Sequence, residues 1–332
     1  MPDDFEPVRS ALREASADLF NRANVVATGI GYKTVQGSTT KTLGIVVSVI
    51  RKEPIANLPS EARIPTTIRG IATDVVETGV LRAFQSPTER HRPAPGGVSI
   101  GHVDITAGTL GCLVKRGNDT FILSNNHVLA NSNAAAIGDP ILQPGPHDGG
   151  TLANDHIADL EDFVPISITG LPSECNIANG IASALNGLAS ALGRGTRLQA
   201  IYTQAEDNRV DAAIARPLNP GDVSSQILNV GTIVGSAEAA LGLAIQKMGR
   251  TTGFTTGEVT QVDVTANVQY GTGRIATFVD QFMAGAMSAG GDSGSAVLDT
   301  GNNLVGLLFA GSDTTTIMNR IQNVFTALNV TV

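Results

Sequence analysis

One short stretch near the end of the chain constrains it most, Gly290-Gly291-Asp292-Ser293-Gly294. A serine between small residues suits a tight turn that exposes its hydroxyl. The neighbouring backbone N–H groups can then point into the same space, as a pocket that stabilises an oxyanion requires. The alternative is a plain glycine-rich turn before a strand. A serine hydroxyl is a poor nucleophile without an adjacent base, so a histidine and a buried acid are sought upstream.

The informative histidine is His127, which follows the apolar run Phe121–Ser124. A residue just after a strand can be held rigidly beside a cleft. The other four histidines lie in linker-like or Gly-, Pro- and Asp-rich surroundings, which are typical of surface and turn histidines: His91, His102, His147 and His156. His127 is therefore the candidate base.

The candidate acid is Asp211, the one charge within the apolar run Val210–Ala215. A carboxylate that orients an imidazole and stabilises its cation needs a buried position, and a buried charge needs a partner. Asp207 and Asp159 are the alternatives, but Asp207 lies beside Glu206 and Asn208 in a predicted turn. The candidate residues thus occur in the order His, Asp, Ser.

With this order, the chain resembles the chymotrypsin-like (trypsin-like) serine proteases and not the subtilisin-like or α/β-hydrolase enzymes. The resemblance covers about residues 97–332 and is carried by Leu123–Val128, Val210–Ile214 and Gly291–Ser295, with Lys247–Gly253 similar to bacterial members. With its extra N-terminal part and no disulfide framework, the chain is more loosely similar to bacterial proteins and to plant narrow-leaf-type proteases.

The resemblance implies a cleft between two six-stranded β-barrels. In it, His127 takes the proton from Ser293, Asp211 fixes the histidine tautomer, and the N–H groups of Gly291 and Ser293 form the oxyanion hole. It also implies that Met287 lies at the base of the pocket for the P1 side chain, with Phe309, Ala310 and Gly311 as its wall. No acid is expected at that base, so an apolar P1 residue is predicted.

Two departures from the family pattern matter. The gap between His127 and Asp211 is long, and a predicted helix at Ile177–Leu192 accounts for the excess; its apolar residues are expected to pack on a barrel flank, with a subunit contact as the alternative. In activated zymogens of the family, the Asp before the serine pairs with a newly cut N-terminus. Here about 96 residues precede the barrels, so either Asp292 has another partner or something else orders the pocket.

Patterning predicts a mainly β chain: a chymotrypsin-like double β-barrel at 98–332, preceded by a small α+β domain at 1–84 and a linker at 85–97. The first domain combines a helix at 2–22 with strands at 25–32, 43–50 and 68–76. Further strands are expected at 198–203, 245–249, 257–264, 276–282 and 304–310, and a helical segment at 316–328.

Composition narrows the partners. The net charge of −8 argues against nucleic acid and anionic membranes as partners, and no apolar run is long enough to span a bilayer. The acidic start of the chain does not read as a secretory signal, and two cysteines are too few for a disulfide framework, so a cytoplasmic location is expected. No metal or organic cofactor is required, and a homo-oligomer is compatible with the Ala-rich apolar helix.

Three functions remain open at this point. The leading one is a serine endopeptidase that acts on protein or peptide substrates. The second is a protease-fold interaction or scaffold protein with low or gated activity. The third is an esterase that uses the same three residues.

Overall fold

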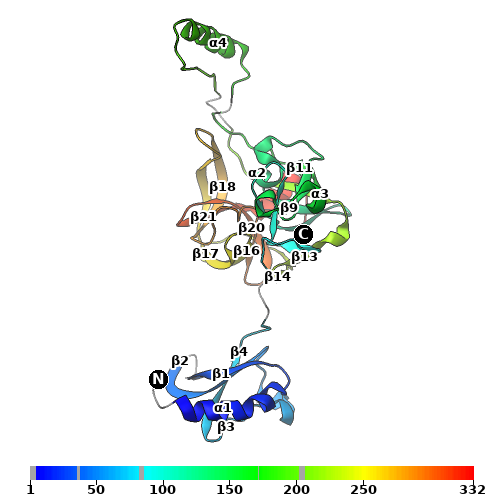
Figure 1. The fold of residues 1–332 in the computed structure, drawn as a ribbon, viewed down its shortest axis with the longest axis vertical. Coiled ribbons are helices and arrows are strands. Elements are labelled where there is room, and N and C mark those ends of the chain that lie inside the picture. Colours follow the sequence, from blue (N-terminus) through cyan, green and yellow to red (C-terminus); the bar gives the residue numbers. More distant parts are fainter. Residues whose placement is uncertain (1–4, 36–37, 82–85, 171, 202–205) are drawn as a thin grey trace. The chain divides into compact units, whose positions relative to one another are not determined.

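The computed structural model describes residues 5–35, 38–81, 86–170, 172–201 and 206–332. The chain divides into two compact units, Met1–Phe84 and Gln85–Val332 (Figure 1).

The N-terminal unit is one helix packed on a four-stranded sheet with the order β1-β2-β4-β3, in which β2 and β4 run parallel. Its elements are α1 (Phe5–Phe20), β1 (Val25–Val35), β2 (Ser38–Val49), η1 (Ile55–Asn57), η2 (Ser60–Ala62), β3 (Thr67–Ile68) and β4 (Ile71–Glu77). The apolar face of α1, with Val8, Ala11 and Leu19, forms one buried cluster with Ile45 and Val47 of β2. Helical periodicity in one segment and β-branched strands in the next thus give the predicted α+β unit.

The second unit begins with a sheet in the order β7-β6-β10-β11-β12-β9-β8. These strands are β6 (Ser99–His102), β7 (Gly108–Thr109), β8 (Cys112–Arg116), β9 (Asp119–Ser124), β10 (Pro140–Leu142), β11 (His156–Phe163) and β12 (Ala213–Pro217). The two outermost strands, β7 and β8, are separated only by Leu110 and Gly111, and Leu110 exchanges backbone hydrogen bonds with Gly97 and Val98. The sheet therefore curls round into a barrel.

A second sheet closes on itself through the additional pairing of β20 with β21. It contains β16 (Ala244–Gly249), β17 (Gly253–Gln269), β18 (Ile275–Gly285), β19 (Ala296–Asp299), β20 (Asn303–Gly311) and β21 (Thr315–Arg320), with the short β15 (Gly235–Ser236) beside β20. Leu123 and Ile214 of the first barrel share a buried cluster with Met248 and Leu307 of the second. The predicted mainly β double barrel is confirmed.

Short elements precede, separate and follow the strands of these two barrels. They are β5 (Ala94–Gly96), α2 (Asn126–Leu129), η3 (Asn131–Asn133), η4 (Pro146–Asp148), α3 (Leu152–Asp155), α4 (Asn176–Ala191), η5 (Pro220–Asp222), β13 (Val223–Ile227), β14 (Gly231–Thr232) and α5 (Ile321–Leu328). Of these, α2 carries the candidate base, and α4 is the helix predicted in the long gap.

Residues 86–97, within the predicted linker, differ from an open linker. β5 pairs with β13, and the side chain of Gln143 binds the backbone of this segment at Glu89 and His91. Proline, glycine and arginine are typical of linkers, but the same residues also build irregular segments held by specific hydrogen bonds. This stretch belongs to the second unit.

The structure differs from the sequence-based predictions at three further segments. The helix predicted at 316–328 is a strand up to Arg320 and becomes α5 only at Ile321, because Thr316 and Met318 alternate inward on β21. The segment 198–203 forms only a single bridge, between Ile201 and Pro172, and its last two residues lie outside the described residues. The helix α4 forms as predicted, but no residue of it is buried, so the expected packing on a barrel flank is wrong.

Candidate active site

The candidate base sits in a one-turn helix directly after β9, where the barrel strand fixes its position. The Nδ1 atom of His127 lies 2.6 Å from Oδ2 of Asp211, and the His127 backbone N–H reaches Oδ1 of the same carboxylate at 3.3 Å. The imidazole remains about one quarter exposed, while the Asp211 side chain is fully buried. An imidazole held through Nδ1 presents Nε2 to the solvent side, and Nε2 has no hydrogen-bond partner among the residues that the structure describes.

Asp211 lies two residues before β12 and receives a further hydrogen bond that the sequence did not predict. The phenol of Tyr270, at the end of β17, donates to Oδ2 of Asp211 at 2.5 Å. Burial, followed by the negative charge of Asp211, raises the pKa of Tyr270 well above its ordinary value, so the phenol keeps its proton. The Tyr270 ring stands edge-on to His127, with 6.0 Å between ring centroids, and stacks on Phe278.

Amide side chains hold the backbone of Asp211 as well. Asn125 donates to its carbonyl at 2.7 Å, and Asn319 both accepts from its N–H and donates to its carbonyl. Because Asn125 directly follows β9 of the first barrel and Asn319 lies on β21 of the second, both barrels fix the acid.

The turn that carries Ser293 has the geometry that its glycines allow. Gly291 and Gly294 have φ angles of +97° and +94°, and a Cβ atom at Gly294 would lie 2.1 Å from the hydroxyl of Ser124. The backbone N–H groups of Gly291 and Ser293 donate no hydrogen bond within the described parts of the chain. The Ser293 hydroxyl donates to the carbonyl of Phe309 at 3.3 Å, and no hydrogen bond between described residues joins it to His127.

Asp292 finds its partner in Lys247. The two side chains are fully buried, and Nζ of Lys247 lies 3.2 Å from Oδ2 of Asp292. The carboxylate also accepts from the Thr252 hydroxyl and from the N–H groups of Ala289, Thr251 and Thr252. Burial would raise the pKa of Asp292, but the Lys247 charge and these donors together lower it. A lysine of β16 therefore fixes the serine turn from within the second barrel.

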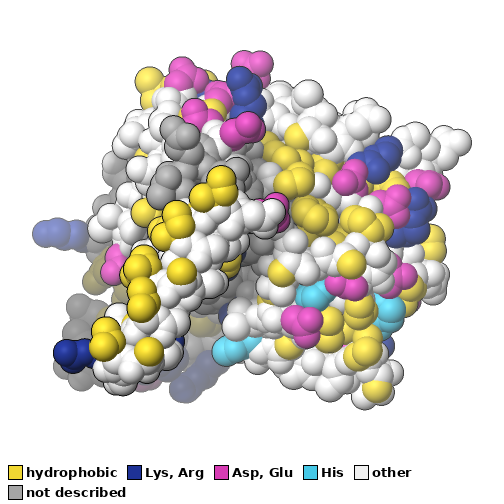
Figure 2. All heavy atoms as spheres, turned by 90° about the horizontal axis from the view of Figure 1, so that it is seen from above, with side chains coloured by type: hydrophobic (Ala, Val, Ile, Leu, Met, Phe, Trp, Pro, Cys, Tyr) yellow, Lys and Arg dark blue, Asp and Glu magenta, His cyan; other side chains and the backbone are white. Residues whose placement is uncertain are grey.

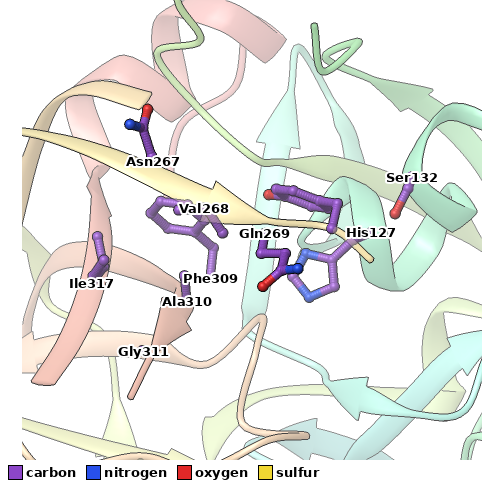
Figure 3. A pocket seen from close by; sticks show the side chains of 10 residues that line it. His127, Ser132, Asn267, Val268, Gln269, Phe309, Ala310, Gly311 and Ile317 are labelled. Atoms are coloured by element: carbon purple, nitrogen blue, oxygen red, sulfur yellow. The ribbon is translucent and has the colours of Figure 1, made fainter. Parts of the chain in front are cut away.

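Two hollows flank this turn. A cavity of about 510 Å³ lies on the His127 side, where Figure 3 shows His127 and Gln269 near one another and Val268, Phe309 and Ile317 further along. A second cavity of about 230 Å³ lies at Ser293, lined by Ser288, Ala289, Gly290, Leu308, Ala310, Gly311, Ser312 and Asp313. Ala310 and Gly311 border both hollows, so the end of β20 forms a continuous edge past the serine.

The residues predicted to form the P1 pocket do not all lie at the same cavity. Ala310 and Gly311 line the hollow at Ser293, whereas Phe309 lines the larger one and packs on Phe278. Met287 lines neither; it is buried in the core of the second barrel, with its sulfur against Gly257, so its placement at the pocket base is wrong. Counting six residues back from the serine failed because β17 offers a gap without a side chain there, and the methionine fills it.

Sequence reasoning also missed Tyr270, Lys247 and Asp313. Lys247 had a usable signal, because it is the one charge within the predicted strand Ile245–Gly249. Tyr270 and Asp313 had none, since each reaches the site only through the pairing of distant strands. Across the described ranges, no three His, Cys, Asp or Glu side chains gather as a metal site would require, and no helix is long and apolar enough to cross a bilayer.

No protein-family model and no curated protein matches the chain. Among solved structures it is similar to protease A of Thermobifida fusca, at 17% identity over 71% of this chain and 96% of that one, with a TM-score of 0.45. It is similar to a glutamic acid specific serine protease at 21% identity, covering 72% and 99% of the two chains with a TM-score of 0.46. A Nocardiopsis protease matches at 16% identity over 71% and 96%, with a TM-score of 0.45.

One curled and one closed barrel share a buried cluster, and a cavity lined from both lies beside the Asp–His pair. The second unit is the mainly β double barrel that the sequence predicted. Within this fold, the assignment of activity to particular residues depends on the geometry of this chain, because the same framework can carry different functions.

Proposed function

We propose that the chain is a serine endopeptidase in which His127, Asp211 and Ser293 form the catalytic triad. The observation that carries the proposal is the His127–Asp211 pair, with a fully buried carboxylate, a partly exposed imidazole and a free Nε2 facing the cleft. A buried carboxylate beside an accessible imidazole is the arrangement that makes histidine a general base.

In the proposed reaction, the Ser293 hydroxyl leaves the carbonyl of Phe309 and gives its proton to Nε2 of His127 as its oxygen attacks the substrate carbonyl. The N–H groups of Gly291 and Ser293 stabilise the oxyanion, and one such donor contributes about 3 kcal/mol to lowering the barrier. His127 then returns the proton to the leaving amine, and water hydrolyses the acyl-enzyme by the same route.

The Lys247–Asp292 pair supports an enzyme that needs no cleavage to become active. Asp292 orders the serine turn through the N–H groups of Ala289 and Thr251, and its counter-ion is part of the folded barrel. This favours the endopeptidase over the scaffold protein, because the turn does not wait for a new N-terminus.

We assign the cavity beside Ser293 to the P1 side chain and propose an uncharged, apolar P1 residue. Ala289, Leu308 and Ala310 supply apolar lining, and the volume of about 230 Å³ suits a medium-sized side chain. Asp313 lies at the same cavity but is exposed to solvent. Cleavage profiling with a peptide library should show apolar P1 residues; a preference for Arg or Lys that Asp313→Asn removes would contradict this assignment.

The decisive experiment is reaction with a fluorophosphonate probe, read by intact mass. We expect labelling of the wild type and of Ser288→Ala, a control serine at the same cavity, and none of Ser293→Ala, whose peptidase rate should fall by about 10⁶. A wild type that is folded but never labelled would overturn the proposal. Labelling with hydrolysis of short esters and no cleavage of peptides would assign the site to an esterase.

A further inference from the structure

The helix α4 presents an apolar face that nothing in the described chain covers. This α4 face consists of Ile177, Ile181, Leu185, Leu188 and Leu192, with exposed fractions of 76%, 57%, 45%, 62% and 77%. Figure 2 shows hydrophobic side chains in a row along this helix. Isolated exposed leucines are common on protein surfaces, but a continuous row on one helix marks an interaction site.

The helix is part of a built hairpin, with its return segment at residues 194–201 tied to the polar side. Asn186 exchanges two hydrogen bonds of 2.7 Å with the backbone of Leu198, and Ser190 accepts from Arg197. At 3.6 residues per turn, Asn186 and Ser190 lie roughly opposite the α4 face. The return segment therefore fixes the helix while leaving the face open, which keeps the ordering cost of an association small.

The spacing on the face is that of a helix pair. Ile181, Leu185, Leu188 and Leu192 follow one another at intervals of four, three and four residues, the alternation by which two helices interlock. At 3.6 residues per turn, the small residues Ala184 and Ala191 flank this row. Small residues beside an apolar row let a second helix approach closely.

The lack of charged residues in α4 favours a second copy of this chain as the partner. From Asn176 to Gly193 the chain contains no Asp, Glu, Lys, Arg or His, although the whole chain carries a net charge of −8. Two copies can bring uncharged helices together without the repulsion that their surfaces otherwise impose. A charged partner would find no counter-ion on α4. A helix that lies on a membrane carries Lys or Arg on its polar face, and α4 has none there.

We propose that the α4 face binds the α4 face of a second copy of this chain and so forms a homodimer. The face is short, since 16 residues of helix extend about 24 Å. An interface of this size belongs to the small, reversible class, so we expect a dissociation constant on the order of micromolar. The proposed dimer does not involve the proposed catalytic residues. A failure to dimerise therefore leaves the proposed peptidase activity testable, and a lack of activity leaves the dimer testable.

The test is sedimentation velocity of the full chain from about 1 µM to about 100 µM. We expect the wild type to pass from monomer to dimer over this range. Leu185 lies near the middle of the face, so it meets the partner helix whether the two helices run parallel or antiparallel. Leu185→Glu and Leu185→Lys should each be monomeric at the highest concentration, with probe labelling of Ser293 unchanged. Because Leu185 is exposed, neither substitution removes core packing.

Two comparisons distinguish a second copy from other occupants. Ser183→Glu adds the same charge on the opposite side of α4 and should dimerise as the wild type does. An equimolar mixture of Leu185→Glu and Leu185→Lys should form a dimer that neither variant forms alone. A wild type that stays monomeric, dimers that survive Leu185→Glu, or a mixture that remains monomeric would each overturn the proposal. Binding of a monomeric wild type to phosphatidylcholine vesicles would do so in favour of lipid.

Discussion

The proposed site contains two completely buried carboxylates, Asp211 and Asp292, and the fold satisfies them in different ways. Asp211 binds an imidazole and a phenol, neither of which carries a permanent charge. Asp292, beside the serine itself, binds the ammonium group of Lys247 together with backbone N–H groups. Both are fully excluded from solvent.

The difference in partners indicates different roles for the two carboxylates. A carboxylate that must stabilise a transient imidazolium is more useful without a permanent cation, because the charge that forms during the reaction then meets an unneutralised partner. A carboxylate that only holds a turn in shape gains from a fixed counter-ion, since a buried charge without one is costly. On this interpretation Asp211 serves catalysis and Asp292 serves structure, so substitutions at the two sites should differ in what they impair.

Among substitutions of the two carboxylates and their partners, Asp211→Asn should have the largest effect on activity. An amide holds the imidazole in the wrong tautomer, and we expect kcat/KM to fall by about 10⁴ with little change in thermal stability. The matched control is Asp139→Asn, which alters a carboxylate 3.1 Å from His102, away from the cleft. Peptide hydrolysis and thermal denaturation of both variants measure the result. Equal losses of activity in the two would show that Asp211 has no special role.

Lys247→Met should act on stability first. It leaves Asp292 buried without its cation, and removal of one partner of such a pair costs about 3–5 kcal/mol of the free energy of unfolding. For a unit of this size, that corresponds to a fall in Tm of roughly 10 °C. The double variant Lys247→Met/Asp292→Asn should regain part of the loss, and Lys115→Met, at an exposed lysine, should lose nothing. A double variant less stable than Lys247→Met would contradict the structural role.

The sequence predicted a role for Asp211, but for Asp292 it did not identify the partner. His127, Asp211 and Ser293 sit in short local patterns, so they could be proposed as site residues, in that order, before any contact was known. The partners of both acids could not, because Tyr270 and Lys247 lie 59 and 45 residues from the carboxylates they bind. Strand pairing, which local patterns leave open, brings them together.

The same limit explains the helices. Apolar periodicity predicted both α1 and α4, and both form. The face of α1 is buried on β2, while the face of α4 remains exposed, because periodicity reveals that a face exists and not what covers it. Met287 was misplaced for a related reason, since the gap at Gly257 that receives it belongs to another strand.

Lowering the pH should have a smaller effect on the stability of the folded protein. The pKa of Asp292 is lowered in the folded state, so its contribution to stability is complete above its unfolded value near 3.8 and is lost as pH falls through the lower folded value. Unfolding by denaturant between pH 5 and about pH 2 should therefore show stability falling below about pH 4. Asp292→Asn should be less stable at neutral pH and show a shallower fall. A steeper fall in this variant would mean that the sign of the linkage is wrong.

Tyr270→Phe should produce the smallest change and test Asp211 most finely. Phenylalanine keeps the stacking on Phe278 and removes only the hydrogen bond to Oδ2 of Asp211. One hydrogen bond to a charged group accounts for about a tenfold fall in kcat/KM.

Without the phenol, Asp211 attracts the imidazolium proton more strongly, so the acid limb of the pH profile of kcat/KM should move to higher pH. Tyr270→Leu, which also loses the stacking, should add a fall in Tm to that movement, whereas Tyr32→Phe in the N-terminal unit should change neither. A tyrosine that acted only through packing would lower Tm and leave the acid limb in place, because packing alone does not alter the charge that Asp211 offers to His127.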